Sequence, residues 1–178
     1  CVLRHARLLA RHGYGVLLYD ERGRGRSGGQ TNGMGWDWHH DVAAAAAWLE
    51  ARGVHRIAAL GLSTGAEAAV TAAARDRRID AVVAEGVINR SVEDSRNLDD
   101  PSSIPYWWVA FQAIRVQTHD APPEPLTDAF RRVAPRPLLL IAAAEYAPER
   151  KVAPIYRRAA GPTASFWLAP TGHTHALQ

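Results

Sequence analysis

The chain has 178 residues, of which 47% are hydrophobic and 22% charged, a composition that excludes a disordered tail and fits one domain with a core. The formal net charge is only +3, and the arginines are scattered instead of forming a basic stripe, which argues against nucleic-acid binding. Cys1 is the only cysteine, so neither an internal disulfide nor a cysteine-based metal site can form.

No apolar stretch is long enough to cross a bilayer, and the first residues have no signal-peptide pattern. We therefore expect a cytoplasmic protein without a membrane segment in this chain. Because the chain starts with cysteine and not methionine, an export signal or a membrane anchor could precede Cys1. The sequence does not indicate an oligomeric state.

Short apolar runs alternate with segments of helical periodicity along the chain. This alternation predicts an α/β fold with a mostly parallel sheet and helices on both faces, in a single domain over 1–178. The expected strands are 14–19, 55–60, 79–84, 137–142 and 164–168, and the expected helices are 2–12, 37–52, 64–74 and 154–160.

A long segment of different character, 89–135, lies between the third and fourth expected strands. It holds six prolines and an aromatic cluster that consists of Tyr106, Trp107, Trp108 and Phe111. An insertion of this length predicts a cap over a site, and not a simple connection. The aromatic side chains would either pack the cap onto the core or contact a substrate.

The sequence Gly-Leu-Ser-Thr-Gly at 61–65 follows an apolar run and opens into an alanine-rich segment. This G-x-S-x-G pattern predicts that Ser63 is a nucleophile on a turn from a strand to a helix. Gly61 and Gly65 have no Cβ, so they allow strand and helix to approach while the serine takes a strained conformation.

Three other signals are weaker. Residues 23–28 match G-x-G-x-x-G, but the loop continues where a dinucleotide-binding helix should begin. Asp37 and Asp41 share a helix face, and capping explains acidic residues at a helix start better than a metal does. Glu67 would face either the site or solvent.

The order of these segments resembles the α/β-hydrolase superfamily over nearly the whole chain. The family's chain order is serine, acid and histidine. This chain has, in that order, a strand and arginine-rich loop (14–27), the serine turn, a cap, a strand followed by acids, and the Gly172-His173 pair. The resemblance also implies that the early strands of that fold are missing.

The resemblance assigns Ser63 as the nucleophile and His173 as the general base, with His175 as its competitor. It expects an acid shortly after the strand at 137–142, where Glu145 stands, with Glu149 as the alternative one helical turn on. The backbone N–H of Thr64 would form half of an oxyanion hole. The second donor normally comes from an earlier loop, and the resemblance implies that this chain lacks it.

We therefore expect a serine hydrolase that cleaves an ester-like or related small-molecule acyl substrate through an acyl-serine intermediate, most simply a carboxylic ester hydrolase. This chemistry needs no metal and no organic cofactor. A peptidase or thioesterase would use the same residues, and a non-catalytic ligand- or partner-binding protein of this fold is the alternative from another class. The aromatic cap favours a substrate with an apolar part.

Overall fold

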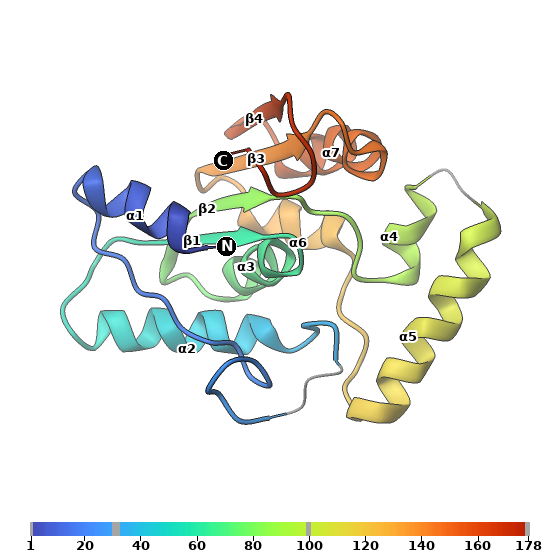
Figure 1. Cartoon of the computed structure of the whole chain (residues 1–178), viewed down its shortest axis with the longest axis horizontal. Coiled ribbons are helices and arrows are strands. Elements are labelled where there is room, and N and C mark those ends of the chain that lie inside the picture. Colours follow the sequence, from blue (N-terminus) through green and yellow to red (C-terminus); the bar gives the residue numbers. More distant parts are fainter. Residues whose placement is uncertain (1, 30–32, 99–100, 177–178) are drawn as a thin grey trace.

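The computed structural model describes residues 2–29, 33–98 and 101–176 (Figure 1). A four-stranded parallel sheet forms its centre, with the strands side by side in the order β1-β2-β3-β4. The predicted α/β architecture is therefore confirmed. The strands are β1 (Ile57–Leu62), β2 (Ile79–Glu85), β3 (Leu138–Ala143) and β4 (Ala164–Ala169).

Helices connect the strands, as parallel pairing requires, because each strand must return to the same end of the sheet before the next begins. The connection from β1 to β2 is one helix, that from β3 to β4 is another, and that from β2 to β3 holds several. The helices are α1 (Leu3–Arg11), α2 (Trp38–Glu50), α3 (Thr64–Arg75), α4 (Val92–Arg96), the 3-10 helix η1 (Pro101–Ser103), α5 (Ile104–Thr118), α6 (Leu126–Val133) and α7 (Ala147–Ala160).

The main core lies between one face of the sheet and the helices α3, α6 and α7. Alanines along α3 let this helix approach the strands closely, and Val70 fills the space between them. Phe130 of α6 stacks on Tyr156 of α7 with ring centroids 5.0 Å apart, and both side chains are fully buried. The core therefore packs α3, which begins directly after Ser63, against the sheet.

Helix α1 reaches the opposite face of the sheet. Ala84 of β2 belongs to the main core, so the side chain of the next residue, Glu85, points to the other side. His5 of α1 is buried and lies with its Nε2 3.3 Å from the Glu85 carboxylate. Helices therefore lie on both faces, as expected.

The segment 14–19 is not the buried strand that its apolar residues predicted. In the structure it has no regular secondary structure, and its Tyr14 and Leu18 side chains are exposed. A strand is buried and ordered only when neighbouring strands take up its backbone hydrogen bonds. In the described part of the chain β1 pairs with β2 alone, and no strand connects this segment to it.

The segment 89–135, predicted to be a cap, divides into two parts. Helix α6 at its end packs between α3 and α7 in the main core, because its apolar side chains Leu126, Ala129, Phe130 and Val133 recur at helical spacing and are all buried. Helices α4 and α5 lie farther from the strands, at one side of the molecule (Figure 1). Only this first part is a candidate for a cap.

None of the described helices is long and apolar enough to cross a membrane.

Candidate active site

Ser63 lies on the sharp turn that joins β1 to α3. Its backbone has φ 52° and ψ −126°, and this positive φ is strained for a residue with a side chain. Its N–H donates to the carbonyl of Glu85 at 2.8 Å, which ties the turn to the neighbouring strand β2. The strain thus persists because both the sheet and α3 fix the turn.

The turn requires glycine at one of its two glycine positions. A Cβ on Gly61 would overlap the backbone carbonyl of Gly65, so the first glycine makes the close approach of strand and helix possible. A Cβ on Gly65 would meet no atom within 4 Å. The expectation that both glycines serve the approach is therefore correct for Gly61 alone.

The side chains of Ser63, His173 and Glu149 form one hydrogen-bonded chain. The Nε2 atom of His173 lies 3.0 Å from Oγ of Ser63, and its Nδ1 lies 2.5 Å from Oε1 of Glu149. A carboxylate only accepts hydrogen bonds, so Nδ1 carries a proton and the neutral ring presents the Nε2 lone pair to the serine hydroxyl. The ring is thus oriented to accept the serine proton.

Glu149 is almost completely buried, and both of its oxygens are bound. Oε1 faces His173, and Oε2 accepts a hydrogen bond from the N–H of Ala143 at the end of β3, at 2.7 Å. The residue lies in the first turn of α7, where the helix dipole favours a negative charge. Strand β3 and helix α7 together therefore hold this carboxylate beneath the histidine.

The structure does not bring Glu145, the acid expected first, to His173. Its side chain is exposed, and its backbone N–H donates to the carbonyl of Thr171. The reason is local: the turn after β3 points residue 145 outward, and only the first turn of α7 aims a side chain back at the sheet. Pro148 in that turn marks the helix start, a signal that could have favoured Glu149.

The other expected residues lie as follows. His175 is exposed and its N–H donates to the carbonyl of Gly172, so His173 alone of the two reaches Ser63. Thr64 is the first residue of α3, next to the serine. The N–H groups of Ala66 and Glu67 both donate to the Ser63 carbonyl and so form the first turn of α3.

Glu67 faces neither the site nor solvent. It is buried behind the serine turn, where Oε1 accepts hydrogen bonds from the N–H groups of Ile88 and Asn89, each at 3.1 Å. Burial raises the pKa of its carboxyl to about 7, although the nearby Arg90 opposes the shift. Glu67 thus links α3 to the loop that follows β2.

The aromatic residues of α5 are divided between packing and exposure. Trp107 stacks on Phe111, and Phe111 contacts Trp36 with ring centroids 5.8 Å apart. This cluster rests on the turn at Gly35, where an added Cβ would lie 2.6 Å from Cγ2 of Thr64. Packing is therefore shown for these rings, whereas Tyr106 on the same helix is 67% exposed.

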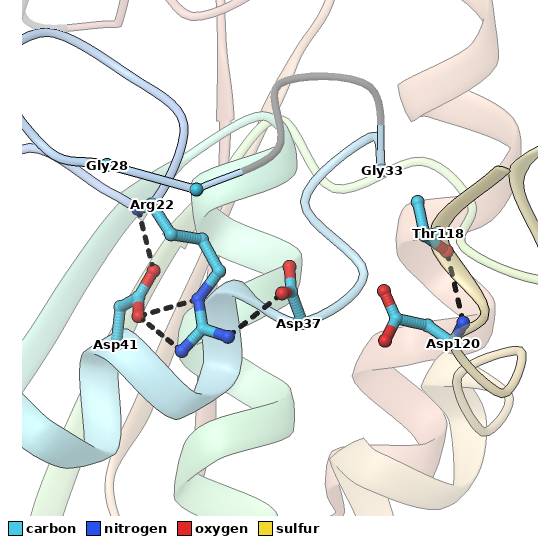
Figure 2. A pocket seen from close by; sticks show the side chains of 8 residues that line it. Arg22, Gly28, Gly33, Asp37, Asp41, Thr118 and Asp120 are labelled. Carbon is cyan, nitrogen blue, oxygen red and sulfur yellow. Dashed lines mark hydrogen bonds and ion pairs between the residues drawn. The ribbon is translucent and has the colours of Figure 1, made fainter.

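A separate polar cavity of about 410 Å³ opens between the loop before α2 and the end of α5 (Figure 2). Its Arg22 binds Asp41 and Asp37, and the hydrogen bonds to Asp41 are the main reason that the pKa of the guanidinium is raised. The two aspartates expected to cap α2 are thus paired with an arginine. Among the described residues no group of three or more potential ligands could hold a metal ion.

Residues 23–26 form turns and bends, and no helix begins within residues 23–28. Asp20 shapes this loop, because its carboxylate accepts the N–H of Arg26 at 3.0 Å and leaves no room for a Cβ on Gly25. The loop therefore lacks the helix that a dinucleotide site needs.

Comparison with known proteins agrees with this fold. A profile of the X-Pro dipeptidyl-peptidase (S15) family matches residues 2–171. An esterase from Pyrococcus furiosus has a TM-score of 0.73 at 21% identity, over 99% of this chain and 68% of that chain. An α/β hydrolase from Penicillium sp. sh18 has a TM-score of 0.69 at 16% identity, over 98% and 77%.

A third similar structure, the esterase domain of a Rhodothermus marinus protein, has a TM-score of 0.61 at 23% identity and covers 94% of this chain and 67% of that chain. A search of curated protein sequences gave no match. The fold is that of the α/β hydrolases, which confirms the resemblance inferred from the sequence and places the protein among the hydrolases. Because the profile spans nearly the whole chain, the protein belongs to the X-Pro dipeptidyl-peptidase (S15) family.

Proposed function

We propose that this protein is a serine hydrolase that cleaves small ester-like acyl substrates through an acyl-serine intermediate. The observation that carries the proposal is the hydrogen-bonded chain of Ser63, His173 and Glu149 on a strained turn between strand and helix. This arrangement is the catalytic triad of the fold, with the serine on a nucleophile elbow. Glu149 takes the role that the sequence assigned first to Glu145.

In the first step the Ser63 hydroxyl attacks the substrate carbonyl carbon while His173 Nε2 takes the hydroxyl proton. The charge that develops on the carbonyl oxygen is stabilised by the N–H of Thr64 at the amino end of α3. His173 then returns the proton to the leaving group as the bond to the carbonyl carbon breaks. Water, activated by the same histidine, releases the acid and restores the serine.

Glu149 supports these steps without transferring a proton itself. Its bond to Nδ1 keeps the tautomer in which Nε2 is a base, and its charge stabilises the imidazolium that forms when His173 takes the proton. The second bond, from the Ala143 N–H, keeps the carboxylate from rotating away from His173. Glu149 itself is buried, which limits the access of water to the carboxylate side of this interaction.

Helices α4 and α5 are the proposed cap. The packed rings of Trp107 and Phe111 join α5 to the turn at Gly35, which contacts Thr64. Tyr106 and Trp108 on the same helix are exposed, so they are the aromatic side chains of the proposed cap that are open to an apolar acyl or alcohol group. The esterases among the structural relatives support an ester as the first substrate class.

Peptide cleavage after proline is the second candidate, because the family profile is that of X-Pro dipeptidyl-peptidases. Both reactions use the same three side chains, so the substrate and not the triad separates them. Hydrolysis of p-nitrophenyl butyrate and of glycyl-prolyl-p-nitroanilide, measured on the same preparation, compares the two. We expect a higher kcat/KM for the ester.

The test of the mechanism is covalent labelling by a fluorophosphonate probe. We expect the folded protein to be labelled and the Ser63→Ala variant to remain unlabelled under the same conditions. Absence of labelling in a protein whose circular dichroism shows a folded state would refute the proposal. Labelling that persists in Ser63→Ala would show that another residue reacts, and would refute the assignment of Ser63.

A further inference from the structure

Glu85 lies where the segments that bear the three active-site residues come together. It is the last residue of β2, an inner strand of the sheet, and pairs in register with Leu62 of β1 and Ile141 of β3. Ser63 directly follows Leu62, and the strand of Ile141 leads to Ala143, which holds Glu149. Only 3% of Glu85 is exposed.

Three hydrogen bonds connect Glu85 to its surroundings. Its backbone carbonyl accepts the N–H of Ser63 at 2.8 Å. Its carboxylate accepts the N–H of Ala176 on Oε1 at 3.0 Å, and Oε2 lies 3.3 Å from Nε2 of His5. One residue therefore binds the serine turn through its main chain and the segment after His173 through its side chain.

The next residue, Gly86, completes the contact with the histidine. It has φ +78°, and an added Cβ would lie 3.0 Å from Cε1 of the His173 ring. The ring thus packs directly against the main chain that follows Glu85. Any movement of the histidine loop toward β2 is blocked by this contact, and movement away from β2 would break the bond from Ala176 to Glu85.

Other contacts of the histidine loop lie before His173, within the loop, or with the turn after β3, where the Tyr146 ring lies 5.1 Å from that of His173. On its near side the carbonyl of Thr171 accepts the N–H of Glu145, and within the loop the N–H of His175 donates to Gly172. After His173, the N–H of Ala176 joins the loop to β2 by its hydrogen bond to the carboxylate of Glu85. A buried acceptor that binds a backbone N–H favours the one loop position in which this bond is made.

We propose that Glu85 is a positioning residue that holds the His173 loop against the Ser63 turn, so that Nε2 stays within hydrogen-bond distance of Oγ. This inference rests on the proposed function of Ser63 and His173. Glu85 does not touch the reacting atoms, and nothing in the proposed triad chemistry requires it. The competing explanation is that Glu85 only anchors α1 through His5.

The test compares Glu85→Ala with Glu85→Gln and His5→Ala. The first readout is the rate constant for labelling by a fluorophosphonate probe. The second is the proton NMR signal of the His173 Nδ1–H, which is strongly deshielded in a short hydrogen bond to a carboxylate and reports the histidine position even in the absence of catalysis. Thermal unfolding of each variant reports its stability.

Glu85→Ala is expected to lower the labelling rate roughly 10–100-fold, because small misplacement of a catalytic group has costs of this size, and to shift or broaden the proton signal. In Glu85→Gln the amide oxygen still accepts from Ala176, so both readouts should stay close to those of the unmodified protein. His5→Ala should lower the unfolding temperature and leave the labelling rate unchanged.

The proposal is overturned if Glu85→Ala keeps the labelling rate and the proton signal, or if His5→Ala slows labelling as much as Glu85→Ala does. Should Glu85→Ala fail to fold, Ala176→Pro removes the donor N–H and leaves Glu85 in place; an unchanged rate and signal there also overturn it. If the unmodified protein is not labelled at all, the proposed function fails, and the proton signal still decides the role of Glu85.

Discussion

Replacement of Glu149 by glutamine is expected to abolish most of the activity while the fold persists. The amide oxygen can keep the bond from the Ala143 N–H, which leaves the NH₂ group facing His173. That group donates, so Nδ1 must accept and the ring proton moves to Nε2, where it faces the Ser63 hydroxyl. The ring can then no longer take the serine proton.

The size of the effect follows from the role of the carboxylate in a triad. A carboxylate-to-amide change at this position of a triad has a cost of about 10⁴ in kcat, so we expect kcat/KM to fall by roughly 10³–10⁴, or about 4–5.5 kcal/mol of transition-state stabilisation. Glu145→Gln is the matched control. Its side chain is exposed and has no bond to His173, so kcat/KM should change less than about twofold.

The assay is the hydrolysis of p-nitrophenyl butyrate at saturating and at low substrate concentration, with urea unfolding of each variant to verify its fold. A large loss in Glu145→Gln together with a small loss in Glu149→Gln would refute the reasoning. Equal small losses in both variants would show that no carboxylate orients His173.

Three further predictions concern stability. Gly61→Ala should lower the free energy of unfolding by about 1–3 kcal/mol or more relative to Gly65→Ala, because only the Cβ added at residue 61 overlaps backbone atoms. Equal midpoints of urea unfolding for the two variants would contradict this. Phe130→Ala should lower the free energy of unfolding by about 3–5 kcal/mol, and a loss below about 1 kcal/mol would contradict its core position. Burial raises the pKa of Glu67 from 4.5 to about 7. Between these two pH values the folded protein keeps the proton on Glu67 and the unfolded chain loses it, so the free energy of unfolding falls by up to roughly 3 kcal/mol as the pH rises through this range. Urea unfolding of Glu67→Gln should lack this decrease, and parallel pH profiles of the two proteins would refute it.

Ser63 and His173 could be found from the sequence because their signals are local. A strand, two glycines and a serine define a turn within a few residues, and the histidine follows the last strand directly. The sequence leaves two candidates for the acid, Glu145 and Glu149. Its direction depends on where α7 begins, and helix boundaries are the least certain part of a sequence-based prediction.

The errors in the fold have a different cause. The apolar residues of 14–19 predicted a buried strand. Whether this segment is buried depends on the strands that lie beside it, which a local sequence pattern does not reveal. Helix α6 belongs to the core and not to the cap, as the helical spacing of its apolar residues indicates. Glu85 gave no signal at all, because its partner Ala176 is 91 residues away in the chain.

The central claim is that Ser63 becomes acylated, and mass spectrometry of the acid-quenched reaction tests it most directly. After brief mixing with p-nitrophenyl butyrate, we predict a mass gain of one butyryl group on the peptide that contains Ser63, and none in Ser63→Ala. Turnover of the ester without an adduct on that peptide, or with the adduct on another residue, would contradict the account.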